Sequence, residues 1–136
     1  MTTLIDTNVL LDLVTDDPVW ADWSTQQLES ASLRGPLLIN DIVYAELSIG
    51  YERIEALDEA VSQMGLVLER LPASALFLAG KAFLTYRRTE GTKDGVLPDF
   101  FIGAHAAILG IPLLTRDAKR YGRYFNGLKL IHPAST

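Results

Sequence analysis

Short apolar runs alternate along this chain with longer stretches in which apolar residues recur every three or four positions. The short runs have the length of buried strands, and the periodic stretches are typical of helices that bury one face. Strands are therefore predicted over residues 3–6, 37–39, 66–71, 111–115 and 128–131. Helices are predicted over residues 8–14, 18–33, 41–49, 54–65, 73–88, 98–109 and 117–124, with a loop over 89–97.

Residues that favour helix ends support these bounds. Pro18 stands where a first-turn proline opens a helix, and Gly35 with Pro36 ends that helix. Asn40 or Asp41 can cap the next one. Because strands and helices alternate, the pattern predicts an α/β fold in which helices cover both faces of a mostly parallel sheet of about five strands.

The amino-acid composition excludes several kinds of catalytic and metal-binding site. The chain has 136 residues, of which 49% are apolar and 21% charged, and no linker divides it, so we expect one globular domain over residues 1–136. It has no cysteine, which excludes disulfides, zinc–thiolate sites and cysteine nucleophiles, and its two histidines argue against a multi-histidine metal site. A net charge of −5 argues against a general electrostatic coat for nucleic acid. It still allows a nucleic-acid enzyme whose acidic site is offset by bound cations.

No segment has the pattern of a signal peptide or a membrane span. Asp6 interrupts the N-terminal apolar run, and the longest apolar run, 100–111, is broken by Gly103, His105 and Gly110. We expect a soluble cytoplasmic protein without a membrane partner.

Three acidic residues are expected at strand-to-helix junctions. Asp6 ends the first strand, Asp99 opens the most apolar helix, and Asp117 follows the fourth strand. Ligands of parallel sheets bind beyond the carboxyl ends of the strands. Each acid also has a structural interpretation, as a helix cap or as a first-turn partner of the helix dipole. Asp12 has Asn8 and Thr15 as helical neighbours, which indicates a polar face rather than a site.

Glu46 is a fourth candidate. On a helix its neighbours include Ile42, Val43, Ile49 and Gly50, which predicts that its carboxylate points toward the core. A core-facing carboxylate needs a cation or hydrogen bonds, so pairing with an arginine is the structural alternative.

A purely structural role explains the four acids together less easily than it explains each acid alone. One cleft lined by four carboxylates would hold charges that repel each other unless a cation occupies it. Oxygen-only donors select Mg²⁺ or Mn²⁺, and carboxylate-bound Mg²⁺ suits phosphodiester hydrolysis.

Four segments carry a resemblance to a known family. They are residues 4–11 (LIDTNVLL), 44–47 (YAEL), 97–106 (LPDFFIGAHA) and 114–117 (LTRD). Together, in this order and across essentially the whole chain, they resemble the PIN-domain ribonucleases, and most of all the VapC-type toxins of toxin–antitoxin pairs.

The resemblance implies a function and a set of site residues. It implies a three-layer α/β/α fold and endonucleolytic cleavage of RNA. Homodimerisation and neutralisation by a cognate antitoxin are implied as well. The implied acidic pocket for Mg²⁺ or Mn²⁺ consists of Asp6, Glu46, Asp99 and Asp117, with polar support from Thr7, Asn8 and Thr115. The sequence leaves open the RNA target and whether one or two metal ions take part.

Three further features have both a functional and a structural interpretation. Basic residues at helical spacing are candidates for RNA contacts or a solvated face: Arg116, Lys119, Arg120 and Arg123. Trp20 and Trp23 fit either the core or an antitoxin-binding groove. His105 is about 120° around its helix from Asp99, which favours a packing role.

Two other functions compete with a nuclease. One is a receiver-like domain with Asp6 as phosphoacceptor, which requires a second acid near the first strand and a suitably placed lysine. The other is a non-catalytic partner-binding module of the same fold.

Overall fold

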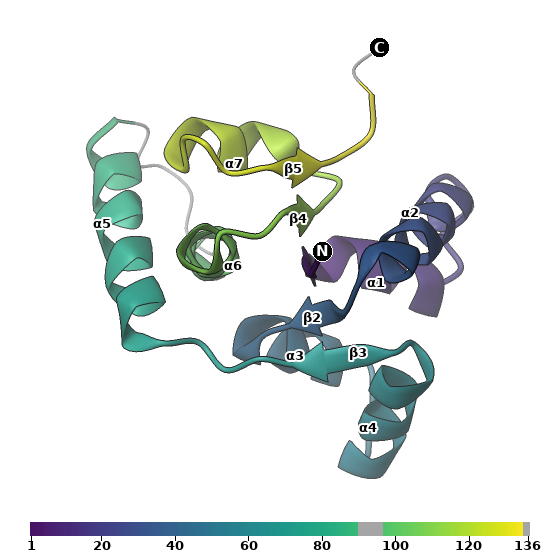
Figure 1. Ribbon diagram of the computed structural model, residues 1–136. Helices are drawn as coiled ribbons and strands as arrows, with labels where there is room; N and C mark the ends of the chain where they lie inside the picture. Colours follow the sequence, from purple (N-terminus) through teal and green to yellow (C-terminus); the bar gives the residue numbers. More distant parts are fainter. Residues whose placement is uncertain (90–96, 135–136) are drawn as a thin grey trace.

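Five short strands form one parallel sheet at the centre of the molecule (Figure 1). The computed structural model describes residues 1–89 and 97–134. The strands lie in the order β3-β2-β1-β4-β5. Their bounds are β1 Thr3–Ile5, β2 Leu37–Ile39, β3 Leu66–Leu68, β4 Leu113–Leu114 and β5 Leu130–Ile131. The predicted parallel sheet of about five strands is confirmed.

Seven helices among the described residues surround this sheet. Figure 1 shows α1, α2 and α4 on one side of it and α5, α6 and α7 on the other, while α3 packs against both α1 and α6. Their bounds are α1 Thr7–Val14, α2 Ala21–Arg34, α3 Asp41–Ser48, α4 Ile54–Gln63, α5 Ala73–Thr89, α6 Leu97–Leu109 and α7 Ala118–Tyr124. The three-layer α/β/α architecture is therefore as predicted. Within the described residues, no helix is long and apolar enough to span a membrane.

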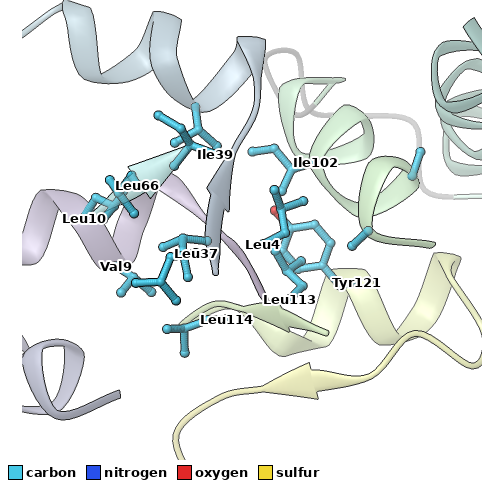
Figure 2. Close-up of a cluster of buried hydrophobic side chains, with 14 of the residues drawn as sticks. Leu4, Val9, Leu10, Leu37, Ile39, Leu66, Ile102, Leu113, Leu114 and Tyr121 are labelled. Atoms are coloured by element: carbon cyan, nitrogen blue, oxygen red, sulfur yellow. The ribbon is translucent and has the colours of Figure 1, made fainter. Parts of the chain in front are cut away.

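The core is built on the central strands, which are apolar because helices cover both of their faces. Leu4, Ile5, Leu113 and Leu114 are fully buried, and Figure 2 shows helix side chains on either side of the strands. His105 is also buried. Its Nδ1 lies 3.2 Å from the side-chain nitrogen of Asn40, and burial lowers the pKa of His105, so its predicted packing role is confirmed.

Two predicted element bounds differ from the structure by three residues, and side-chain acceptors explain both. The helix predicted from Pro18 begins only at Ala21, because Oδ1 of Asp17 accepts hydrogen bonds from the backbone of Val19 and Trp20 and holds a turn there.

The strand predicted over 66–71 ends at Leu68, since the backbone N–H of Leu71 donates to the side chain of Asp41 instead of a neighbouring strand. The loop predicted over 89–97 lies outside the described residues, apart from Thr89 and Leu97, which end α5 and begin α6.

The direction of the chain across the sheet reverses at β1. From β1 the chain adds β2 and β3 on one side, then returns to place β4 and β5 on the other. In the β1–β4 register Ile5 pairs with Leu114, and the backbone N–H of Asp6 donates to the carbonyl of Leu114. Asp6 and Thr115 therefore leave adjacent strands side by side at the switch point, where open parallel sheets bind ligands.

A close approach between α6 and α7 depends on Gly103. A Cβ at this position would lie 2.6 Å from the ring of Phe125 and 2.9 Å from the ring of Tyr121, closer than packed atoms allow. Asp99 stands one helical turn before Gly103 on α6, so this contact brings α7 against the face of α6 that carries Asp99.

Candidate acidic active site

Asp6 is held at the end of β1 by three side-chain donors. Thr115 donates to its Oδ2 at 2.7 Å, Tyr121 at 3.0 Å and Asn8 at 3.4 Å. Asp6 occupies the N-cap position of α1 as the cap interpretation expects, but its side chain makes no capping hydrogen bond there. Asp6 is only 4% exposed. Its carboxylate is thus oriented by the surrounding residues rather than by the helix that follows it.

Burial dominates the electrostatics of Asp6. It raises the pKa of this carboxyl to about 6, the hydrogen bond from Thr115 offsets part of the rise, and the neighbouring charge of Asp99 adds to it. The phosphoacceptor alternative required a lysine beside Asp6. Among the described residues, the side chains that donate to Asp6 are the hydroxyls of Thr115 and Tyr121 and the amide of Asn8. The site offers no support for that alternative.

Glu46 joins the same region through Thr7. The hydroxyl of Thr7, which directly follows Asp6, donates to Oε1 of Glu46 at 2.6 Å. The expectation that Ile49 and Gly50 share a core face with Glu46 is wrong, because α3 ends at Ser48 and Ile49 is 86% exposed. Glu46 itself is half-buried. Its carboxylate is directed to the end of β1 by a hydrogen bond.

Asp99 and Asp117 meet at Arg120. Nη1 of Arg120 donates to Oδ2 of Asp99 at 2.6 Å and lies 3.8 Å from Oδ2 of Asp117. Asp117 follows β4 and its backbone N–H donates to Thr115, whereas its side chain makes no capping bond to α7. Asp117 therefore occupies the expected N-cap position, but its carboxylate is directed to Arg120 and not to the helix.

Asp99 stands in the first turn of α6, which keeps the helix-dipole interpretation open. Among the residues that the structure describes, the element before α6 is the helix α5, so the expected strand-to-helix junction at Asp99 is not seen. Burial raises the pKa of Asp99, the ion pair with Arg120 lowers it, and the charges of Glu46 and Asp117 raise it again. The four acids are therefore close enough to influence one another.

The chemistry of this donor set suits a hard cation. All the acidic donors are carboxylate oxygens, and a guanidinium already lies against two of them as a counterion. Among the described residues, no three acidic, histidine or cysteine side chains converge closely enough to hold a metal ion as they stand.

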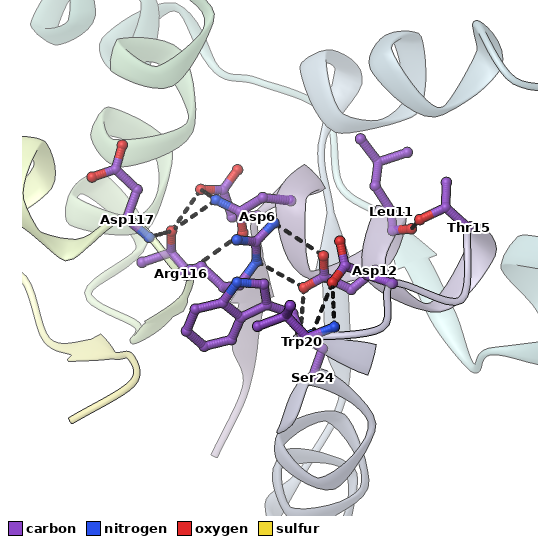
Figure 3. A network of polar contacts seen from close by, with 12 residues as sticks. Asp6, Leu11, Asp12, Thr15, Trp20, Ser24, Arg116 and Asp117 are labelled. Carbon is purple, nitrogen blue, oxygen red and sulfur yellow. Dashed lines mark hydrogen bonds and ion pairs between the residues drawn. The ribbon is translucent and has the colours of Figure 1, made fainter. Parts of the chain in front are cut away.

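A second polar network lies beside the acids (Figure 3). Asp12 is 2% exposed, so the polar face predicted for it is buried and not solvated. Its Oδ1 accepts a 3.0 Å hydrogen bond from Nη2 of Arg116, Nε of Arg116 lies 2.8 Å from Oδ2, and Ser24 donates to the same Oδ2 at 2.7 Å. The partner of Asp12 comes from a segment that is remote in sequence, and helical neighbours alone could not indicate it.

The basic residues predicted at helical spacing lie in different environments. The guanidinium of Arg116 lies 5.1 Å from the ring of Trp20, and Trp20 contacts Trp23 edge-to-face at 6.0 Å. Both tryptophans are half-buried, so they are neither core residues nor fully exposed groove residues. Arg120 is held by the acids, while Lys119 and Arg123 are exposed on α7.

The sequence matches the family model of the PIN domain over residues 3–124. The chain belongs to the PIN-domain family. A comparison with curated proteins gives no match.

Solved structures share the PIN fold over the full chain. VapBC2 from Rickettsia felis, bound to a DNA fragment from its promoter, is 23% identical with a TM-score of 0.74, covering 97% of this chain and 98% of that one. VapBC-1 from nontypeable Haemophilus influenzae is 19% identical with a TM-score of 0.71 and the same coverage of 97% and 98%. VapC20 from Mycobacterium tuberculosis, described as a Sarcin-Ricin loop cleaving toxin, is 16% identical with a TM-score of 0.64, covering 96% and 99%.

Two residues of this PIN domain were missed as site residues by the sequence analysis. Tyr121 bonds Asp6, and Gly103 permits the approach of α7 that brings Tyr121 there. The ion pair of Arg120 with Asp99 was also not predicted, since the sequence analysis considered Arg120 only as an RNA contact or as part of a solvated face. The three-residue spacing of Asp117 and Arg120 was a usable signal for their contact, whereas no local signal indicated the other two.

Proposed function

We propose that this PIN domain is a metal-dependent endoribonuclease and the toxin of a type II toxin–antitoxin pair, acting in the cytoplasm. The observation that carries the proposal is the gathering of Asp6, Glu46, Asp99 and Asp117 at one edge of the sheet, where their charges interact. Family membership supports nuclease chemistry at that edge. A partner-binding module without catalysis would gain nothing from the mutual repulsion of these carboxylates.

Each site residue has a defined task under this proposal. Asp6 and Asp99 would be the principal holders of Mg²⁺ or Mn²⁺, and Glu46 and Asp117 would complete the coordination or orient the attacking water. Thr115, Asn8 and Tyr121 orient Asp6, and Thr7 orients Glu46. When bound, the metal ion supplies an activated water and neutralises charge on the phosphate.

The RNA substrate is supported by one relative and by exposed basic residues. VapC20 is described as cleaving the Sarcin-Ricin loop, and it shares this fold. Lys119 and Arg123 lie exposed on the helix that follows Asp117, where they can contact the phosphates of a bound strand. Arg116 contributes less to RNA binding, since its guanidinium is paired with Asp12.

Protein partners are the second half of the proposal. One protein of the same fold, from Klebsiella pneumoniae, was solved as a toxin–antitoxin complex, and VapBC-5 from Mycobacterium tuberculosis is described as a member of the VapBC family of toxin–antitoxin systems. This chain exposes large apolar side chains that would suit an antitoxin or a second copy of the chain: Val19, Leu33, Ile49, Ile54, Leu76 and Phe77. We propose a cognate antitoxin and a homodimer on that basis.

Cleavage of total RNA by the purified chain tests the enzyme. We expect cutting in Mg²⁺ or Mn²⁺, none in excess EDTA, and none by Asp99→Asn in either condition. Asp22→Asn, which removes an exposed acid from α2, is the matched control and should cut normally. Undiminished cutting in EDTA would overturn the metal mechanism, and a chain that cuts no RNA with Mg²⁺ would favour the non-catalytic module.

Co-expression tests the partner. The product of the neighbouring gene is expected to relieve growth arrest, to co-purify with the chain and to suppress RNA cleavage. Growth arrest that is unchanged by this product would contradict the toxin–antitoxin assignment.

A further inference from the structure

Arg120 binds the acids that the proposed metal ion would use. Its Nη1 lies 2.6 Å from Oδ2 of Asp99 and 3.8 Å from Oδ2 of Asp117. Asp117 and Arg120 are three residues apart on successive turns, so the same face of the segment carries both charges. A charge-assisted contact of 2.6 Å is at the short end for a guanidinium and a carboxylate.

The surroundings hold the guanidinium in this position. The side chain of Arg120 is only 23% exposed, unlike that of an ordinary surface arginine. The next residue, Tyr121, is buried and bonded to Asp6, which fixes the rotation of α7. Gly103 lets α7 approach α6 on the face that carries Asp99. Arg120 is therefore directed into the acidic edge by packing on both sides.

We propose that Arg120 is a built-in counterion that competes with the divalent cation for Asp99 and Asp117. This inference rests on the proposed metal-dependent function. A divalent cation bound by Oδ2 of Asp99 and by Asp117 would lie beside the guanidinium, and repulsion between the two positive charges favours movement of Arg120 away from the acids. Once released, its planar guanidinium is free to bind a phosphate of the substrate.

Binding of Mn²⁺ alone to the purified full chain tests the competition, with free Mn²⁺ followed by electron paramagnetic resonance. We expect Arg120→Gln to bind Mn²⁺ about tenfold more tightly than the wild type, the change expected when one positive charge is removed from beside a dication in a water-like medium. Arg120→Lys keeps the charge and should stay within about threefold of the wild type.

Lys119→Gln is the matched control for net charge. It removes the same unit charge from the same helix, and the exposed side chain of Lys119 has no ion pair among the residues that the structure describes. Its Mn²⁺ affinity is expected to change by less than about twofold, since exposed charges are screened by water and salt. A Lys119→Gln effect as large as that of Arg120→Gln would contradict a specific role for Arg120.

A second measurement uses the wild type, so it does not depend on how the variants fold. The Nε–Hε signal of Arg120 in an NMR spectrum, assigned by its loss in Arg120→Lys, should move when Mg²⁺ is added, because the guanidinium loses its carboxylate partner. A signal that stays in place at saturating Mg²⁺ would overturn the inference, as would unchanged or weaker Mn²⁺ binding by folded Arg120→Gln. Wild type that binds neither metal would instead overturn the metal-dependent function, and the inference with it.

Discussion

The hydroxyl of Tyr121 donates a 3.0 Å hydrogen bond to Oδ2 of Asp6, and both residues are buried. This bond stabilises the ionised carboxylate and so lowers the pKa of Asp6 against the larger effect of burial. In turn, burial and the charge of Asp6 raise the pKa of Tyr121 well above its usual value, which keeps the phenol protonated and able to donate.

Removal of that hydroxyl is expected to change both the pKa and the stability. Tyr121→Phe should raise the pKa of Asp6 further above its wild-type value of about 6, because the charged form loses a donor. The free energy of unfolding should fall by about 1–3 kcal/mol. A ¹³C NMR titration of the carboxyl and urea unfolding measure the two effects. Tyr51→Phe, which removes a phenol that is not among the donors to Asp6, is the control, and an equal shift of the Asp6 pKa in this variant would contradict the assignment.

The raised pKa of Asp6 makes the stability of the protein without added metal depend on pH. The folded pKa is about 6 and the unfolded value 3.8, so between these values the folded state holds more protons than the unfolded state. The free energy of unfolding should therefore fall as pH rises from about 4 to about 6, by about 3 kcal/mol from this residue, and then level off.

The difference between the wild type and Asp6→Asn isolates this effect. The lowered pKa of His105 acts in the opposite direction, because its stabilisation is lost as pH falls, and it contributes equally to both proteins. We expect Asp6→Asn to be as stable as the wild type or more stable at pH 7, and to lack RNA cleavage. A variant that is destabilised at pH 7 and still cuts RNA would show that Asp6 is structural.

Gly103 should tolerate no side chain. Gly103→Ala is expected to lower the free energy of unfolding by about 1–3 kcal/mol, because its Cβ would overlap the rings of Phe125 and Tyr121. Gly80→Ala is the matched control, since a Cβ there meets no atom within 4 Å and alanine favours the helix. Urea unfolding of both variants should give changes of opposite sign, and a neutral Gly103→Ala would mean that α6 and α7 separate easily.

The buried pair of Asp12 and Arg116 is expected to be a major contribution to stability. Asp12→Ala should lower the free energy of unfolding by about 3–5 kcal/mol, since it leaves a partly buried guanidinium without its partner. Glu55→Ala breaks an exposed pair with Arg53 and should change it by less than about 1 kcal/mol. Similar losses in the two variants, measured by urea unfolding, would contradict the importance of burial for the first pair.

Site residues that come directly after a strand of the sheet could be predicted from the local sequence. Asp6 and Asp117 could be placed because apolar runs mark β1 and β4, and the carboxyl ends of neighbouring parallel strands share an edge. Asn40 could be recognised as a cap, and its side chain accepts from the backbone of Ile42 and Val43.

Residues whose environment depends on the docking of helices could not be placed. The partner of Asp12 lies 104 positions away, so its polar helical neighbours suggested exposure where an ion pair permits burial. Likewise, the position of Arg120 follows from the contact of α7 with α6, which the helical spacing of basic residues does not encode.

The order of the strands also determines when the acidic edge is completed during synthesis. Asp6 lies near the start of the chain, whereas Thr115 and Tyr121, which bond it, follow 109 and 115 positions later. A nascent chain that has emerged only as far as α5 contains β1, β2 and β3 but neither β4 nor Asp117. For a protein proposed to cut RNA, this means that the proposed acidic site cannot assemble until β4 and α7 have been synthesised.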